Sequence, residues 1–308
     1  MKPTRSGSLK LFTFRGINVF VHWSWLLIAY YEYRMNFSGY SSPQWIVFET
    51  LAIFGIVLLH EFGHSLACRS VGGKSDTIVL WPLGGVAYVA PPQRPGPELW
   101  SIAAGPLVNV ALIPIFFGFV RIAGNLGWAA SARDAYRFVY ALSFINILML
   151  KFNLLPIYPL DGGQILRSLL WFVFGKARSL FIASIIGFGG VALLIIGALV
   201  QHSTWMGIIA AFVLMNCWGG LKYAQALSKI GKLPKHTQFT CPSCKTSPPI
   251  AALWKCGHCG TRFNTFVSNA TCPGCAQIFT TTKCFECHES APFAQWSAQP
   301  TAPPVISV

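Results

Sequence analysis

Two histidines and a glutamate near residue 60 are the first residues whose types and spacing could do chemistry. His60 and His64 stand four apart in LLHEFGHSLACR, so on a helix both imidazoles project from one face, within reach of one metal ion. Glu61 lies beside them, where it could take a proton from a water held by that ion. The spacing predicts zinc-assisted hydrolysis, because zinc lowers the pKa of its water to about 7. A paired structural cluster of these three side chains is the alternative.

A catalytic zinc keeps three protein ligands and leaves its fourth position open, and Asp161 is the candidate for the third. It lies in NLLPIYPLDGG, where Pro156 and Pro159 each remove a backbone donor and break the helix. Irregular backbone inside a membrane is tolerated only where it lines a cavity or is buried in protein. An isolated acid there needs a partner, and a cation fits. A loop aspartate that caps the next helix is the alternative.

The composition indicates a membrane protein. The 308 residues are 54% hydrophobic and 10% charged, with a mean hydropathy of +0.53, whereas a soluble domain carries roughly 25% charged residues. The net charge of +14 would suit a nucleic-acid binder, but the basic residues mostly flank apolar stretches. From His236 onward there are four basic residues and two acids, so binding of nucleic acid is not expected.

Six stretches approach the roughly 20 apolar residues that a spanning helix needs. They are residues 17–33, 45–68, 98–121, 135–155, 179–200 and 204–221. Basic flanks before the first span and after the last predict that both termini are cytoplasmic, in a prokaryotic plasma membrane, although the basic loop near Arg133 departs from the rule. Roughly 15 residues of helix, about 22 Å, separate Trp45 from His60, which puts the histidines inside the hydrocarbon.

A β-hairpin is predicted between the second and third spans, in DTIVLWPLGGVAYVAPP. Branched and aromatic residues flank Leu83-Gly84-Gly85 and predict two short strands joined by a turn. Because bare strand edges cannot face lipid, the hairpin should pack on helices, line a wet cavity or accept another strand.

Together these motifs resemble the site-2 protease family of intramembrane zinc metalloproteases over roughly residues 45–165. HEFGH matches the family's first motif, residues 153–163 match its Asn-x-x-Pro…Leu-Asp-Gly motif, and the LGG hairpin and residues 105–109 also fit. The PDZ-like domain and the nucleotide-sensing modules of well-known branches are not recognised here. The resemblance implies cleavage of a partly unwound transmembrane helix of a membrane-protein substrate.

The resemblance also implies roles for individual residues. His60, His64 and Asp161 would hold the catalytic zinc, with Glu61 as general base. Asn153 would contact the substrate backbone near the scissile bond, and Asn109 would support substrate binding. The hairpin would offer an edge strand to the unwound substrate, which agrees with recognition by strand addition.

Eight of the ten cysteines form four Cys-x-x-Cys knuckles after residue 240. Two knuckles make one tetrahedral Cys₄ site, so four predict two structural zinc ions, an arrangement that resembles tandem zinc ribbons. Consecutive pairing is expected, with an interleaved arrangement left open. The first predicted site is Cys241, Cys244, Cys256 and Cys259, and the second is Cys272, Cys275, Cys284 and Cys287.

Two other interpretations of the tail compete with zinc. CGHC at 256–259 resembles a disulfide-exchange motif but lacks a βαβ pattern around it, and CFECH at 284–288 matches a c-type haem attachment site. Haem attachment would require the tail to lie outside the cytoplasm, and four knuckles together favour zinc. Cys68 and Cys217 lie in spans and are interpreted as packing residues.

The predicted fold is an α-helical polytopic membrane protein with about six transmembrane helices, a membrane-associated β-hairpin and a small zinc-ribbon domain. Residues 1–235 form the transmembrane metalloprotease domain, 236–291 the tandem zinc ribbons and 292–308 a disordered tail. The expected activity is that of an intramembrane zinc endopeptidase, with the ribbons docking a cytoplasmic regulatory protein or serving only as a cap. The alternative is a membrane-embedded zinc-binding adaptor without proteolytic activity. A transporter would need broken helices in two corresponding halves, and only one break is evident.

Overall fold

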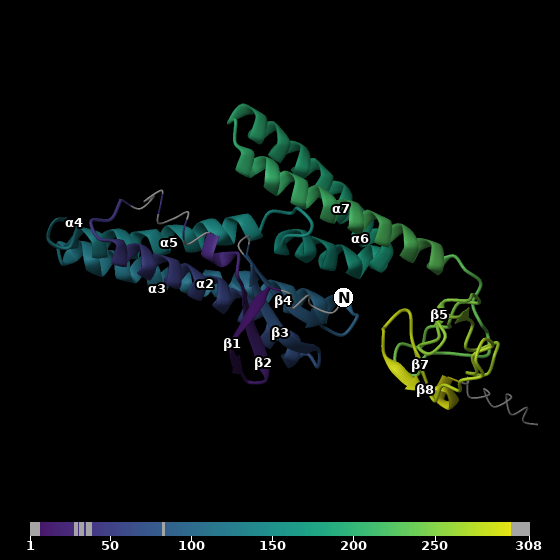
Figure 1. The fold of residues 1–308 in the computed structure, drawn as a ribbon. Coiled ribbons are helices and arrows are strands. Elements are labelled where there is room, and N and C mark those ends of the chain that lie inside the picture. The colour runs from purple at the N-terminus through teal and green to yellow at the C-terminus, as the bar shows by residue number, and fades with distance from the viewer. Residues whose placement is uncertain (1–6, 28–29, 31–33, 35–38, 82–83, 297–308) are drawn as a thin grey trace, which may run out of the picture. The chain divides into compact units, whose positions relative to one another are not determined.

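The computed structural model describes residues 7–296 except 28–29, 31–33, 35–38 and 82–83 (Figure 1). The chain forms two compact units, residues 1–222 and 223–308, with the boundary inside the last long helix. In the described part, five helices are long and apolar enough to cross a membrane. They are α2 (Pro43–Ser70), α3 (Pro95–Asn125), α5 (Arg133–Asn153), α6 (Asp161–Val200) and α7 (Thr204–Gly231).

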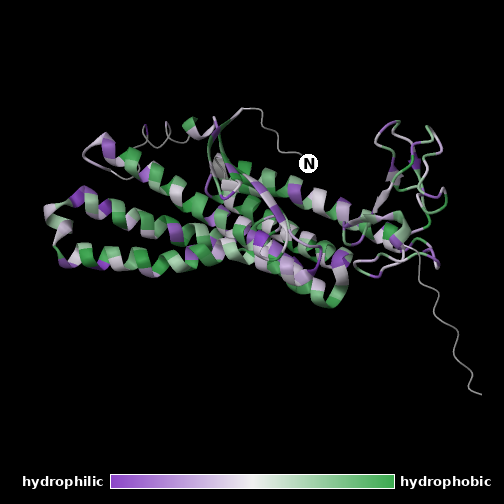
Figure 2. Ribbon diagram, turned by 90° about the horizontal axis from the view of Figure 1, so that it is seen from below, coloured by the Kyte–Doolittle hydropathy of each residue, from purple (hydrophilic) through white to green (hydrophobic). Residues whose placement is uncertain are grey.

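The long helices are apolar on their outward faces as well as on their inward ones. Figure 2 shows them coloured mostly as hydrophobic, and large side chains such as Val173, Leu193 and Met215 are two-thirds or more exposed. A helix that is hydrophobic all round belongs in a core or in lipid. The exposure of these side chains therefore fits a bilayer as the surrounding medium. The short helix α4 (Trp128–Ser131) joins α3 to α5.

A four-stranded sheet packs against α2 in the first unit. Its order is β1 (Ser8–Phe14), β2 (Ile17–His22), β3 (Lys74–Trp81) and β4 (Gly84–Ala90). β1 and β2 are antiparallel, β2 and β3 parallel, and β3 and β4 antiparallel. The predicted hairpin is confirmed as β3 and β4, while the two N-terminal strands were not expected.

The predicted membrane span at 17–33 is wrong at its start, because residues 17–22 are β2. Ile17 and Val19 alternate with less buried neighbours and are fully buried beside Val57 of α2, which is the two-residue period of a strand. Further along, Trp25 packs on Phe54 and Tyr40 on Trp45. These two contacts place described residues on either side of the gap against α2. The rest of the predicted span lies partly outside the described residues.

The second unit is built of two small hairpins. They are β5 (Trp254–Lys255) with β6 (Arg262–Phe263), and β7 (Thr281–Lys283) with β8 (Ser290–Pro292), followed by the 3₁₀ turn η1 (Phe293–Trp296). Trp296 is fully buried against Phe266. Residues 292–296, predicted to be disordered, are therefore ordered by this aromatic contact. Residues 297–308 lie outside the described residues.

Candidate active site and metal centres

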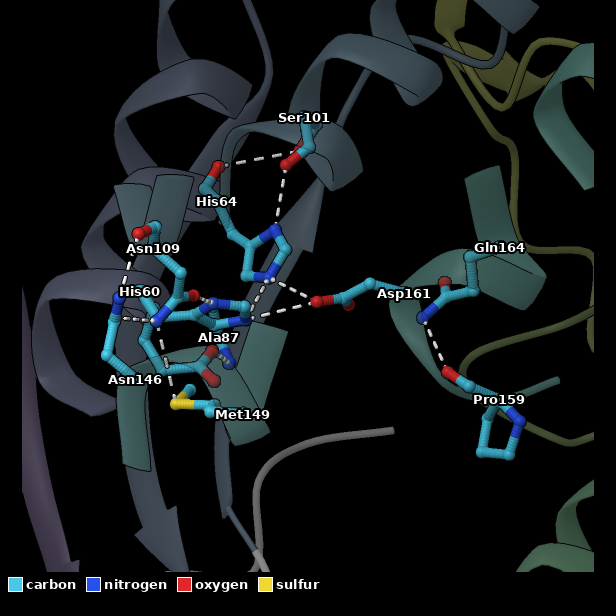
Figure 3. A network of polar contacts seen from close by, with 11 residues as sticks. His60, His64, Ala87, Ser101, Asn109, Asn146, Met149, Pro159, Asp161 and Gln164 are labelled. Atoms are coloured by element: carbon cyan, nitrogen blue, oxygen red, sulfur yellow. Dashed lines mark hydrogen bonds and ion pairs between the residues drawn. The ribbon is translucent and has the colours of Figure 1, made fainter. Parts of the chain in front are cut away.

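Three side chains from two distant segments converge at one point in the first unit. His60 and His64 come from one face of α2, and Asp161 is the first residue of α6 (Figure 3). Asp161 Oδ2 lies 3.0 Å from His60 Nε2 and 3.4 Å from His64 Nε2. The two Nε2 atoms are 3.1 Å apart. The predicted convergence of the imidazole pair and the carboxylate is thus what the structure contains.

The hydrogen bonds around His60 determine which of its nitrogens carries the proton. Asn146 Nδ2 donates to the backbone carbonyl of Asn109, so Asn146 Oδ1 must accept from Asn109 Nδ2, at 2.8 Å. Asn109 Oδ1 then faces His60 Nδ1 at 2.6 Å and can only accept. His60 therefore carries its proton on Nδ1 and presents a lone pair on Nε2.

The same holds for His64, whose Nδ1 lies 2.9 Å from the carbonyl oxygen of Ser101. Both Nε2 lone pairs then face each other and a carboxylate oxygen inside a buried site, and a cation relieves that repulsion. Tetrahedral zinc with bonds of about 2.0–2.1 Å separates its ligand atoms by about 3.3 Å. The observed separations of 3.0–3.4 Å match that value, so the donor set fits zinc.

Glu61 is held beside the histidines by the outer strand of the sheet. The backbone N–H of Ala87 in β4 donates to Glu61 Oε2 at 2.8 Å. Among the described residues this is the one hydrogen bond to the carboxylate, which leaves Oε1 for proton transfer. A carboxylate used only for packing would not need this placement next to two imidazoles.

At three glycines, the space that a side chain would occupy is taken by a site residue or by neighbouring backbone. A Cβ on Gly85 would lie 2.2 Å from Glu61 Cγ, and a Cβ on Gly105 would lie 2.2 Å from His64 Nε2. A Cβ on Gly63 would lie 2.7 Å from the carbonyl oxygen of Ala104, which lets α2 and α3 approach closely. These contacts explain physically why the LGG and Gly-Pro-Leu-Val-Asn segments carry glycine.

The predicted interruption of the helix before Asp161 is confirmed. α5 ends at Asn153 and α6 begins at Asp161, with Leu160 as the residue preceding the helix. Asp161 directs its carboxylate to the imidazoles, so the alternative of a helix-capping loop aspartate is not what the geometry supports. The proline pair occupies the break, as the loss of two backbone donors requires.

The two asparagines singled out by the resemblance lie in different surroundings. Asn109 is fully buried, and its amide is used by His60 and Asn146, which favours a role in positioning the ligand over direct contact with a substrate. Asn153 is partly exposed at the end of α5. Asn146 was missed by the sequence analysis, although a polar amide in the apolar span 135–155 is itself a signal.

Two polar contacts fasten α6 to α3 and to the segment just before α3, and neither was predicted. Arg167 forms an ion pair with Glu98, and both are nearly buried. Lys176 Nζ donates to Gln93 Oε1 at 2.7 Å. Because a single charge buried without a partner is costly, these contacts fix the position of the helix that carries Asp161.

The consecutive pairing predicted for the cysteine knuckles is wrong, because the knuckles nest. Cys241, Cys244, Cys284 and Cys287 form one group, and Cys256, Cys259, Cys272 and Cys275 form the other. The first knuckle meets the fourth because the Thr240 N–H donates to the Trp296 carbonyl, and both knuckles pack around Phe266. The inner two knuckles meet around Phe263.

Each cysteine group has the geometry of a four-thiolate site. Sulfur atoms across each group lie 3.5–3.8 Å apart, in free cysteines rather than disulfides. The Thr261 hydroxyl lies 3.2 Å from Cys259 Sγ, and by donating to the thiolate it lowers the pKa of Cys259 to about 6. That shift favours the anionic form that binds metal.

Comparisons with known proteins agree with this site. Residues 48–126 and 118–197 match peptidase family M50. A zinc metalloprotease of Methanocaldococcus jannaschii is 32% identical over 211 residues, covering 67% of this chain and 58% of that protein. Stage IV sporulation protein FB of Bacillus subtilis is 32% identical over 118 residues, 38% of each chain. This chain thus spans less than two thirds of the length of these relatives.

A solved structure is also similar. The site-2 protease from Methanocaldococcus jannaschii matches with a TM-score of 0.52 and 28% identity, covering 70% of this chain and 95% of that one. Its likeness extends over most of the first unit, where the histidine pair and Asp161 lie.

Replacing Asn146 tests the hydrogen-bond chain that orients His60. Asn146→Ala frees the Asn109 amide to turn its NH₂ toward His60 Nδ1, which favours the wrong tautomer. We expect affinity for zinc at this site to fall by about 10–100-fold, measured by chelator competition. Asn216→Ala is the control, because among the described residues the hydrogen bond of Asn216 is to its own helix, at the Phe212 carbonyl. An unchanged affinity in Asn146→Ala would contradict the assignment.

Paired cysteine substitutions test the nesting of the knuckles. Cys241→Ser with Cys287→Ser removes ligands from one group, whereas Cys241→Ser with Cys256→Ser removes ligands from both. We expect the first double variant to lose one zinc ion per chain and the second to lose two, measured by elemental analysis of the full chain. The reverse result would restore consecutive pairing.

Proposed function

This chain belongs to peptidase family M50, the site-2 protease family, and from that membership we propose that it is an intramembrane zinc metalloprotease. It hydrolyses a peptide bond within or near the transmembrane segment of a membrane-protein substrate. The observation that carries the proposal is the convergence of His60, His64 and Asp161 with Glu61 alongside, in a unit built from apolar helices. A zinc-binding adaptor would have no use for Glu61 beside the imidazoles.

The proposed roles follow from the contacts of each residue. His60, His64 and Asp161 hold the catalytic ion, which when bound supplies a Lewis acid that acidifies water and polarises the peptide carbonyl. Glu61 takes the proton of the attacking water on Oε1 and returns it to the leaving amine. The Ala87 N–H keeps the other oxygen in place, so the base stays oriented toward the reacting atoms.

The substrate is proposed to add as a strand beside β4. β4 is the outer strand of the sheet, and its residue Ala87 contacts the general base. An unwound segment that pairs with this edge would bring its peptide bonds next to Glu61. Asn153, partly exposed at the end of α5, is proposed to bind the substrate backbone near the scissile bond.

Both termini are proposed to lie on the cytoplasmic side of a prokaryotic plasma membrane. The sequence before the first predicted span carries four basic residues and no acid, which supports a cytoplasmic N-terminus: Lys2, Arg5, Lys10 and Arg15. Lysines flank the last span, as the positive-inside rule requires: Lys222, Lys229, Lys232 and Lys235.

Substituting the general base separates catalysis from metal binding. Glu61→Gln keeps the size of the side chain and an acceptor for Ala87 N–H but cannot take a proton. We expect the rate of cleavage of a transmembrane substrate in proteoliposomes to fall by at least about 10²-fold, with the zinc content unchanged. A Gln variant that cleaves at the wild-type rate would refute proteolysis through Glu61.

The cysteine-rich unit is proposed to hold two structural zinc ions and to dock a cytoplasmic regulatory protein or the cytoplasmic part of the substrate. Its two nested groups and shared aromatic core support a rigid module whose surface can carry such a contact. The first unit does not need it to complete the catalytic ligand set.

Deleting residues 236–308 tests docking. Docking raises the effective concentration of substrate at the site, so we expect cleavage of a substrate with its cytoplasmic portion to slow by at least about tenfold. Cleavage of the same substrate without that portion should be unaffected and serves as control. Equal rates for both substrates, before and after deletion, would remove docking and leave only a stabilising cap.

A further inference from the structure

The loop that leads into Asp161 is seated against a wall of glycines on α6 and α7. Ile157 is buried with Val191 of α6 and with Val213 and Cys217 of α7. A Cβ on Gly190 would lie 2.5 Å from both Ile157 Cδ1 and Cγ1, so the isoleucine fills the space that a side chain would take.

Tyr158 is held in the same place by both helices. Cys217 Sγ lies 2.9 Å from the Tyr158 carbonyl oxygen, to which the thiol donates. A Cβ on Gly220 would lie 3.0 Å from Tyr158 Cε1, and one on Gly187 would lie 3.3 Å from the Tyr158 carbonyl oxygen. Small residues let helices and loops approach closely in a membrane, and here they receive two successive loop residues.

The loop is in turn fastened to the start of α6, so its position sets that of Asp161. A Cβ on Gly163 would lie 2.4 Å from the Ile157 carbonyl carbon, and one on Gly162 would lie 2.3 Å from the Leu154 carbonyl oxygen. Gln164 Nε2 donates to the Pro159 carbonyl at 2.9 Å, as Figure 3 shows. Two glycines and a side-chain hydrogen bond therefore link the loop to the first turn of the helix.

From these contacts we propose that the paired helices α6 and α7 form a socket that positions the third metal ligand. Gly187, Gly190 and Gly220 are its wall, and Ile157 and Tyr158 are the residues that it seats. The wall contacts the loop and not Asp161 in the close approaches given above, so the socket acts by setting how far Asp161 reaches toward the imidazoles. The inference rests on the proposed function and adds positioning residues outside the ligand set.

The packing explains why the wall positions require glycine, whereas two neighbouring glycines have room for a side chain. Gly189 and Gly219 belong to the same two helices, each next to a wall residue, yet a Cβ on either would meet nothing within 4 Å. Helix propensity alone would favour alanine at all five positions. The wall positions exclude it because the seated loop takes the space of a side chain. Cys217 Sγ also crowds a Cβ on Gly187, at 2.6 Å, and Ser184 Oγ crowds one on Gly220, at 2.8 Å.

A matched pair of variants of the full chain tests the socket. Gly190→Ala pushes Ile157 out of its seat, whereas Gly189→Ala adds the same methyl group one residue away in open space. The ion concerned is the one whose binding is lost in Asp161→Ala. We expect Gly190→Ala to weaken its binding by at least tenfold, measured by chelator competition. The same variant should lower kcat more than it changes KM. Gly189→Ala should match the wild type in both measurements.

A rescue variant separates positioning from general damage to folding. Ile157→Ala removes Cδ1, Cγ1 and Cγ2, the three side-chain atoms that crowd a methyl group on residue 190. Gly190→Ala with Ile157→Ala should therefore bind the ion more tightly than Gly190→Ala alone. Ile157→Ala alone, which empties the seat without a clash, should also weaken binding of that ion.

The outcomes distinguish the socket from the proposed active site. If Gly190→Ala and Gly189→Ala bind the ion equally well, the socket is refuted while the metal site stands. Failure of Ile157→Ala to restore any of the binding lost in Gly190→Ala would likewise refute it. If the wild type and Asp161→Ala hold the same number of ions, the metal site is refuted and the socket with it.

Discussion

The first unit depends on one electrostatic constraint, the meeting of two imidazole lone pairs and a carboxylate oxygen in a buried place. His60 Nε2, His64 Nε2 and Asp161 Oδ2 lie 3.0–3.4 Å apart. In a medium of low dielectric such an array is unfavourable without a cation. Each ligand must therefore be fixed by a further contact. Asn109 holds His60, the Ser101 carbonyl holds His64, and the loop before α6 positions Asp161. Much of the surrounding structure can be understood as this support.

Close approach of backbone is the second requirement, and glycine supplies it repeatedly. Gly85 makes room for Glu61 and Gly105 for His64, while Gly162 and Gly163 let the loop fold onto α6. In each case the space of a Cβ is taken by a site residue or by the backbone that carries one. In lipid, where association between helices gains little from the hydrophobic effect, such close packing carries much of the stabilisation.

The ligand set was predictable because its signals are local or chemically unusual. The spacing of His60 and His64 fixes a shared helix face, and the proline-broken segment marks Asp161. The hairpin was predictable from its alternation. β1 and β2 were not, because β2 pairs with the distant strand β3, where the bonded residues Asn18 and Asp76 are 58 positions apart in sequence. The span predicted at 17–33 was misplaced since an apolar run of this length fits a buried strand as well as a helix.

The nested cysteine groups failed as a prediction for a similar reason. Four knuckles with the same Cys-x-x-Cys spacing carry no information on which pairs meet. The first and fourth knuckles pack together around Phe266 and Trp296, a contact that depends on the folded unit. Asn146 and the Glu98–Arg167 pair were also missed, because their partners become visible only when α3, α5 and α6 are packed together.

The course of α6 shows how these supports combine. Gly175, with φ of 76°, interrupts the helix, and the part before it carries Asp161 and is fastened to α3 by Arg167. Lys176, just after the break, reaches Gln93, in the segment that precedes α3. The part beyond it supplies the wall that seats Ile157. A single straight helix would have to satisfy both sets of contacts with one axis. The break lets each half take its own direction, so that Asp161 is held from α3 on one side and from the seated loop on the other.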